Sequence, residues 1–341
     1  MKSKPMPKTR YPRLRRWVAF LMGLTAISIS HHAKPEVALD LERVDERLAR
    51  TESQYTDIVE GSEKQVRWAN AKVKSEYALV YLHGFSASRR EISPVTENLA
   101  DLLNANVYYP RLRGHARGGA AMAEGNVDDW KKDTLEALDV ASQIGEKIVF
   151  ISTSTGGTLA TWLMALLTET QDPRLNKIER SILVSPNFGL ANASGEIMRW
   201  GWGLQLAKWL RGDEHFFVPQ NELHSLYWTE RYPLEAIVPM VHLLDEVNEL
   251  DLSAVSVPQH FVYAPEDQVI DVSAINEIAS KYKSASTSMN EITNATDPAQ
   301  HVIAGDACSP ETTDELVALM QEMITASSTL TNTDSSASAA N

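Results

Sequence analysis

The sequence has a single cysteine, Cys308, so no disulfide can form within the chain, and we expect this thiol to be structural. No unit of about 20 to 50 residues repeats, which excludes solenoids and propellers. There is no glycine-rich phosphate loop followed by lysine and no dinucleotide-binding glycine pattern. The histidines between 215 and 260 also lack metal-ligand spacing with carboxylates. We therefore expect no cofactor and no metal.

Basic residues are scarce outside the N-terminus. The chain has 32 Lys and Arg against 45 Asp and Glu, giving a net charge of −13. Seven of the basic residues stand in the first 30 positions, where no acidic residue occurs. The rest of the chain is thus more acidic than the net charge alone indicates, and it repels a phosphate backbone. We expect no nucleic-acid partner.

The basic N-terminus is followed by 14 residues without a charge, WVAFLMGLTAISIS, at 17–30. This run has the length of a signal-peptide core and is shorter than the roughly 20 residues that span a bilayer. We expect an export signal at 1–30, cleaved after Ser28 or Ser30. The alternative is an uncleaved inner-membrane anchor, which associates the protein with the membrane. Both outcomes predict an exported protein, periplasmic or anchored to the inner membrane.

Three further segments follow this leader. Residues 31–54 are charged and helix-compatible, which predicts a helical stalk or packing helix between the leader and the body. Residues 326–341 are rich in Ser, Thr, Ala and Asn, and we expect a disordered tail because they have little to bury. Residues 55–325 form the predicted folded domain.

Short apolar runs alternate with longer helical patterns within 55–325. The runs predict strands buried on both faces at 77–84, 105–112, 147–153, 180–186 and 258–265. Strands that alternate with helices favour an α/β fold with a mostly parallel central sheet and helices on both faces. Functional sites in such sheets gather at the carboxyl ends of the strands.

The interval from about 187 to 250 breaks this alternation and is too long for a connecting loop. Among its helix-like pieces stand aromatic residues, including Trp200, Trp202, Trp209, Phe216, Phe217, Tyr227 and Trp228. We expect a helical insertion that caps the site. Its aromatic residues either fill the core of the insertion or favour an apolar part of a substrate.

The stretch KIVFISTSTGGTLA at 147–160 places small polar residues between a predicted strand and a predicted helix. Its composition is that of a linker. Its position matches the strand–turn–helix pattern G-x-S-x-G, which presents a nucleophilic serine. In that alignment Ser154 is central, Gly156 takes the second glycine and Ser152 replaces the first.

A serine hydroxyl needs a base near neutral pH, and the base needs an acid that orients it. In this architecture the acid and then the histidine follow the serine along the chain. Glu266 and Asp267 follow the last predicted strand, and His301 is the only histidine after them. His301 is therefore the candidate base.

Acyl transfer also needs backbone N–H groups for the oxyanion. The segment LHGFSAS at 82–88 follows the first predicted strand with a His-Gly step. The Phe85 N–H is one candidate donor, and the Thr155 N–H, directly after the serine, is the other. We expect His83 to brace this loop by hydrogen bonds.

Six segments stand in the order and at about the spacing seen in α/β-hydrolase carboxylesterases and monoacylglycerol-lipase-like enzymes. They are LHGFSASRREISPVTENLADLL, YYPRLRGHARGG, DDWKKD, STSTGGTLA, PEDQVID and QHVIAGD. The chain resembles these enzymes over about residues 75–325. The resemblance implies the α/β-hydrolase fold, with a helical cap at about 187–250.

By position, the resemblance implies a catalytic triad of Ser154, Asp267 and His301. Asp267 is preferred over Glu266 and Asp271 because the family acid stands two residues before a Val-Val or Val-Ile pair, here Val269 and Ile270. The sequence departs from the family pattern at Ser152, where glycine is usual. It also departs at Ala116, where the Gly-His-Gly loop often has its second glycine.

The expected activity is hydrolysis of carboxylic esters through an acyl-enzyme on Ser154. The expected substrate is a small acyl ester, short- to medium-chain or monoacylglycerol-like. A thioesterase and a serine aminopeptidase are alternatives on the same scaffold. The alternative of another class is a non-catalytic protein that binds an apolar ligand. The sequence leaves the oligomeric state open.

Overall fold

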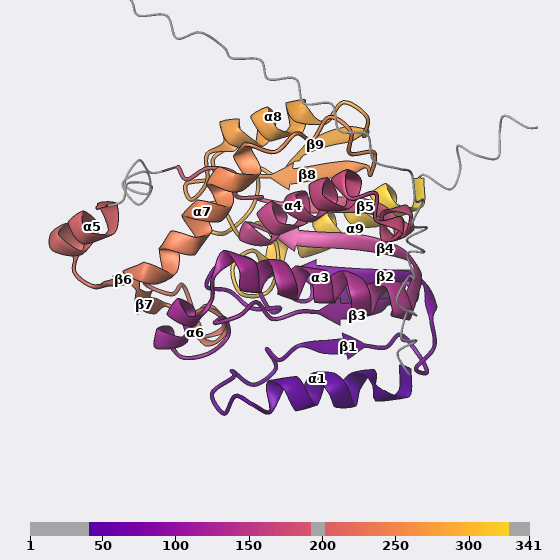
Figure 1. The fold of residues 1–341 in the computed structure, drawn as a ribbon, viewed down its shortest axis with the longest axis horizontal. Helices are drawn as coiled ribbons and strands as arrows, with labels where there is room; N and C mark the ends of the chain where they lie inside the picture. The colour runs from indigo at the N-terminus through magenta and orange to yellow at the C-terminus, as the bar shows by residue number, and fades with distance from the viewer. Residues whose placement is uncertain (1–40, 192–201, 327–341) are drawn as a thin grey trace, which may run out of the picture. The chain divides into compact units, whose positions relative to one another are not determined.

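The computed structural model describes residues 41–191 and 202–326 of the 341-residue chain. The leader predicted at 1–30 and nearly all of the predicted tail lie outside the described residues. A seven-stranded sheet forms the centre of this part (Figure 1). Its strands, in spatial order, are β1 (Gln65–Arg67), β3 (Asn106–Tyr109), β2 (Ser75–Leu82), β4 (Gly145–Thr153), β5 (Ile178–Val184), β8 (Gln259–Tyr263) and β9 (Thr287–Glu291).

The sheet is parallel except for β1, which pairs antiparallel with β3. This confirms the predicted α/β fold. The predicted strands correspond to β2, β3, β4, β5 and β8, whereas the edge strands β1 and β9 were not predicted. In β9 exposed and half-buried side chains alternate over the polar sequence TSMNE, so it lacks the apolar run that marks a central strand.

Helices cover both faces of the sheet (Figure 1). One face is covered by α2 (Val95–Leu103) and α9 (Thr313–Thr325), which share a hydrophobic core with the strands. The other is covered by α3 (Val127–Ile144), α4 (Thr155–Glu169), α7 (Ile237–Asn248) and α8 (Val272–Lys281). This layering explains why the central strands are apolar on both sides.

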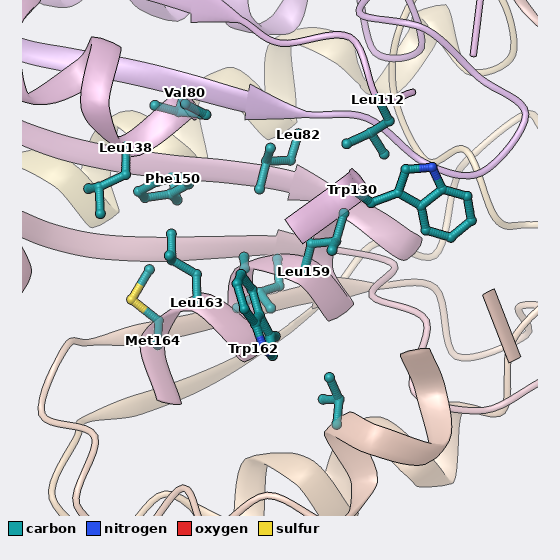
Figure 2. Packing of buried hydrophobic residues seen from close by; sticks show 14 of the residues in the cluster. Val80, Leu82, Leu112, Trp130, Leu138, Phe150, Leu159, Trp162, Leu163 and Met164 are labelled. Atoms are coloured by element: carbon teal, nitrogen blue, oxygen red, sulfur yellow. The ribbon is translucent and has the colours of Figure 1, made fainter. Parts of the chain in front are cut away.

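Successive side chains of β4 enter different cores. Phe150 packs in the core under α3 and α4, while Val149 and Ile151 pack in the core under α2 and α9. Figure 2 shows Phe150 beside Leu138 of α3 and near Leu163 of α4. Each large apolar side chain buried in this way contributes about 1.5–3 kcal/mol. The strand that leads to Ser154 is therefore held from both faces.

The predicted helix at 31–54 is described from residue 41. Helix α1 (Val44–Glu52) packs beside β1, with Val44 and Leu48 fully buried. Its last residue, Glu52, forms a buried ion pair with Arg111, in which Arg111 Nε lies 2.7 Å from Glu52 Oε2. These contacts attach α1 to the folded body.

The predicted cap interval contains α5 (Gly203–Arg211), the hairpin of β6 (Glu214–Phe216) and β7 (Arg231–Pro233), α6 (Glu222–Tyr227) and then α7. The segments from α5 to β7 lie at the carboxyl edge of the sheet (Figure 1). Helix α7 belongs instead to the layer that covers the sheet, because its Leu243 and Val247 are buried in the core that α3 and α4 share. Among residues 41–191 and 202–326, no helix is both long and apolar enough to cross a membrane.

Candidate active site

Ser154 occupies a one-residue turn between β4 and α4. Its φ of 52° and ψ of −118° are rare for a residue with a side chain, and such backbone strain costs on the order of 1–3 kcal/mol. Hydrogen bonds hold the turn: the Ser154 N–H donates to Val184 O at 3.0 Å, and Ser154 O accepts from the Asn187 N–H at 3.0 Å. The turn places Ser154 at the N-terminus of α4, as predicted.

The two glycines after Ser154 allow the helix to approach the sheet closely. A methyl group at Gly156 would lie 2.1 Å from Leu82 O, and one at Gly157 would lie 2.7 Å from Pro186 Cβ. Both positions therefore require glycine. Ser152 is accommodated because it lies within β4, fully buried, where its hydroxyl donates to Ile182 O at 3.4 Å.

Three of the predicted site residues meet in one hydrogen-bonded chain. His301 Nε2 lies 3.1 Å from Ser154 Oγ, and His301 Nδ1 lies 2.7 Å from Asp267 Oδ2. A carboxylate can only accept, so the ring proton is on Nδ1 and Nε2 is free to accept from the serine hydroxyl. All three residues are buried, with exposed fractions of 6 to 9%.

The neighbouring acids occupy other positions. Asp267 Oδ1 accepts from the N–H groups of Val269 and Ile270 at 2.8 and 3.1 Å, which fixes the carboxylate toward the histidine. Asp271 instead caps α8 by accepting from the Ser273 N–H at 2.9 Å. Glu266 is exposed to solvent. Only Asp267 of the three contacts His301.

Asp297 positions the loop that carries His301, and the sequence reasoning missed it. Its Oδ2 accepts from the backbone N–H groups of His301 and Val302, both at 2.9 Å. Its Oδ1 accepts from the Gln220 side chain of the cap at 2.6 Å. The Asp-Pro step four residues before His301 is a turn signal that marks this loop in the sequence.

The pKa of His301 lies above its ordinary value of 6.5. Burial by itself lowers this pKa because it penalises the charged ring. The hydrogen bond and the negative charge of Asp267, together with the charges of Glu91 and Asp297, outweigh burial. The site thus stabilises a protonated imidazole, the form that a general base reaches when it takes a proton.

The predicted oxyanion donors flank the serine. A methyl group at Gly84 would lie 3.1 Å from Ser154 Cβ, so the loop that leads to Phe85 runs directly against the serine. Thr155 is the first residue of α4, where N–H groups have no partner within the helix. Within the described residues, the N–H groups of Phe85 and Thr155 form no hydrogen bond to the protein.

His83 braces this loop, as predicted. It is fully buried, its Nε2 accepts from the Leu112 N–H at 3.1 Å, and its Nδ1–H donates to Gly84 O at 2.9 Å. Burial lowers the pKa of His83 to about 4, so the ring is neutral near neutral pH. His83 acts on the loop backbone and does not contact the serine hydroxyl.

Aromatic rings pack around Phe85. Its ring centroid lies 5.6 Å from His115, 6.1 Å from Trp130 and 5.4 Å from Tyr232 of β7. Ile237 and the buried Ala236 pack in the same cluster. Residues at the end of the cap thus meet the loop beside Ser154 through apolar contacts.

The cap is attached to both loops of the site. The Thr229 N–H donates to Ser86 O at 2.7 Å, which joins the cap to the loop of Phe85. The Gln220 side chain joins it to Asp297, and the Asn221 side chain donates to Ala307 O at 2.6 Å beyond His301. Among the described residues, no group of three or more His, Cys, Asp or Glu side chains could hold a metal ion.

Residues 79–317 match the model of the alpha/beta hydrolase family. Comparison with curated proteins gives no match. A solved structure from work on LipS and LipT, two metagenome-derived lipolytic enzymes, has a TM-score of 0.63 and 17% identity, over 78% of this chain and 98% of that chain. A monoacylglycerol lipase from Paleococcus ferrophilus has a TM-score of 0.54 and 12% identity, over 77% and 98% of the two chains.

A soluble variant of monoglyceride lipase from Saccharomyces cerevisiae, in complex with a substrate analogue, also has a TM-score of 0.54, with 13% identity over 77% and 91% of the two chains. At these identities the solved structures establish a common fold. The family match runs from within β2 to within α9, so it includes the serine turn and the loops of Asp267 and His301. The chain belongs to the alpha/beta hydrolase family.

Proposed function

We propose that the protein is a serine esterase that hydrolyses small carboxylic esters through an acyl-enzyme on Ser154. The observation that carries this proposal is the hydrogen-bonded chain from Ser154 Oγ through His301 to Asp267, with distances of 3.1 and 2.7 Å. Two backbone N–H groups that have no hydrogen-bond partner among the described residues flank the same serine. A nucleophile, an oriented base and oxyanion donors are what acyl transfer requires.

The first half-reaction acylates the serine. Ser154 Oγ attacks the ester carbonyl carbon while His301 Nε2 takes the hydroxyl proton. The negative charge that develops on the carbonyl oxygen is stabilised by the N–H groups of Phe85 and Thr155. The intermediate collapses, the bond to the alkoxy oxygen breaks, and His301 returns its proton to the departing alcohol.

The second half-reaction releases the acid. A water molecule attacks the acyl carbonyl while His301 takes one of its protons, and the bond to Ser154 Oγ then breaks. His301 returns the proton to the serine. Asp267 keeps its charge and holds the imidazole in the required tautomer throughout.

The apolar surroundings support an apolar acyl group. Phe85 lies in a cluster with Met122, Tyr232 and Ile237. Asn187, whose N–H binds Ser154 O, also contacts Met240 Sδ of α7 at 3.7 Å. Apolar side chains therefore stand next to the residues that hold the serine, in accord with a short- to medium-chain or monoacylglycerol-like ester.

Substitution of the nucleophile tests this function. The wild-type protein is expected to hydrolyse p-nitrophenyl butyrate, and Ser154→Ala is expected to lower kcat by at least about 10⁴-fold. Ser152→Ala, two residues before Ser154 and within β4, is the matched control and should retain activity within about threefold. Activity retained by Ser154→Ala contradicts the proposal.

A substrate series separates the esterase from the other activities on this scaffold. Esters of increasing chain length, matching thioesters and aminoacyl anilides are compared by kcat/KM. Esters are expected to be preferred. A higher kcat/KM for the thioesters would instead indicate a thioesterase, and a higher kcat/KM for the anilides would indicate an aminopeptidase.

We also propose that residues 1–30 direct the protein out of the cytoplasm. The support is the basic N-terminus followed by the uncharged run at 17–30. Cell fractionation with N-terminal sequencing tests this. A cytoplasmic protein that keeps Met1 contradicts it, and a membrane-bound protein that keeps Met1 identifies the segment as an anchor.

A further inference from the structure

Glu91, in the loop between β2 and α2, is a buried carboxyl group outside the proposed triad. It is 2% exposed, and none of the described Lys or Arg residues forms an ion pair with it. Its Oε2 accepts from the Gly84 N–H at 2.7 Å and from the Tyr81 hydroxyl at 2.8 Å. Burying a carboxyl group without a cationic partner costs folding free energy, so we asked what Glu91 contributes at this position.

The carboxyl lies behind the loop that runs against the serine. A methyl group at Gly84 would lie 2.6 Å from Glu91 Oε1 and 3.1 Å from Ser154 Cβ, so the Gly84 backbone is packed between the two. Glu91 binds the Gly84 N–H, and the next N–H along the chain is that of Phe85. The carboxyl therefore fixes the peptide that precedes the proposed oxyanion donor.

Tyr81 extends this contact to the strand of the nucleophile. Its hydroxyl binds Glu91 and also lies 3.0 Å from Thr153 Oγ1, on the residue before Ser154. The hydrogen bonds from Glu91 to Tyr81 and from Tyr81 to Thr153 thus connect the loop of Phe85 to the end of β4. A fully buried network of this kind holds both parts in one relative position.

The charge of Glu91 also acts on the base. From β2 Tyr81 faces the carboxyl, and from the loop before α9 His301 and Cys308 interact with it electrostatically. Burial raises the pKa of Glu91 to about 7, although the Gly84 N–H, the Tyr81 hydroxyl and the charge of His301 each lower it. His301 is faced in addition by Asp267 and Asp297. When ionised, Glu91 adds a third negative charge that favours protonated His301.

We propose that Glu91 is a positioning residue of the active site, which holds the Gly84–Phe85 peptide against Ser154 and stabilises the positive charge that His301 gains during acyl transfer. This inference rests on the proposed esterase function. It assigns two separable effects to one carboxyl: a hydrogen bond to the loop and a charge behind the base. Glu91 itself contacts neither the substrate nor the reacting atoms.

The charge and the hydrogen bond are separated by two substitutions. Glu91→Gln keeps an oxygen acceptor for the Gly84 N–H but removes the charge. Its kcat is expected to fall about tenfold with little change in KM, because the protonated base is less stabilised in the transition state. The acidic pKa of its kcat/KM profile is expected to move down by about half a pH unit or more.

Glu91→Asp keeps the negative charge, so the acidic pKa of its kcat/KM profile should stay at the wild-type value. Its kcat is expected to fall because the shorter side chain no longer holds the loop.

One control variant and one substitute variant accompany Glu91→Gln. Glu97→Gln, a carboxamide substitution on α2 where the carboxylate accepts from the hydroxyls of Ser93 and Thr96, should leave both kcat and the profile unchanged. If Glu91→Gln does not fold, Tyr81→Phe replaces it. That variant removes a donor that lowers the pKa of Glu91, so less of the carboxyl is ionised and the acidic pKa moves in the same direction by a smaller amount.

The rate at which a fluorophosphonate probe labels Ser154 is followed over the same pH range, because labelling reports the serine and its base without a substrate. If the wild-type protein is labelled and the variant, Glu91→Gln or Tyr81→Phe where that one is used, has the same acidic pKa of labelling, the role of Glu91 is overturned. The proposed function then still stands. Absence of labelling in the wild-type protein overturns the proposed function and this inference with it. A lowered acidic pKa together with a lowered kcat supports the inference.

Discussion

Three acids close together in the sequence have three different environments in the structure. Glu266 is exposed, Asp267 binds His301, and Asp271 caps α8. The sequence alone leaves Glu266 and Asp267 as equal candidates, and only the family resemblance favours Asp267. The geometry explains that preference, because the N–H groups of Val269 and Ile270 turn the Asp267 carboxylate toward the histidine.

Asparagine substitutions distinguish two of these acids. Asp267→Asn is expected to lower kcat by about 10⁴-fold, because an amide no longer holds His301 in the tautomer that carries its proton on Nδ1. Asp271→Asn is the matched control: asparagine caps a helix as well as aspartate, so activity and stability should stay close to the wild type. Ester hydrolysis and denaturant unfolding are measured for both. Equal activity of the two variants would contradict the proposed role of Asp267.

The turn between β4 and α4 depends on how closely α4 approaches the sheet. Gly156 has no room for a side chain because its Cβ would lie 2.1 Å from Leu82 O. The hydrogen bonds of Ser154 to Val184 and Asn187 hold the strained backbone in place. The position of Ser154 is thus fixed by three strands, β2, β4 and β5, and not by the turn alone.

A methyl group at this helix–sheet contact tests that account. Gly156→Ala is expected to lower the free energy of unfolding by at least about 2 kcal/mol, since the clash is with backbone atoms that cannot rotate away. Gly118→Ala is the matched control, because its Cβ meets no atom within 4 Å and its φ of −58° suits alanine. That change should stay within about 0.5 kcal/mol of the wild type. Chemical denaturation measures both, and equal stabilities would contradict the close approach.

The elements with strong periodic patterns were predictable, and those without were not. The central strands have apolar side chains on both faces, so β2, β4 and β5 could be identified from the sequence. The edge strand β9 is polar and pairs on one side with β8. Its place follows from tertiary contacts that the local pattern does not encode.

At the scale of the whole molecule, residues far apart in sequence meet at the carboxyl edge of one mostly parallel sheet. Phe85 follows β2, Ser154 follows β4, Asp267 follows β8, and His301 precedes α9. The proposed triad could be predicted from the sequence because its chain order is a property of the architecture. Glu91 and Asp297 were missed because their roles depend on which loops pack together, and a single carboxyl in a loop has no sequence pattern.

The most direct test of this account is to identify the residue that becomes acylated. The full-length protein is reacted with a fluorophosphonate, digested and analysed by tandem mass spectrometry. One adduct per chain is expected, on Ser154. It should be absent in Ser154→Ala, and its formation should slow strongly when His301 is replaced by alanine. An adduct on Ser152, or no adduct on a protein that hydrolyses esters, would contradict it.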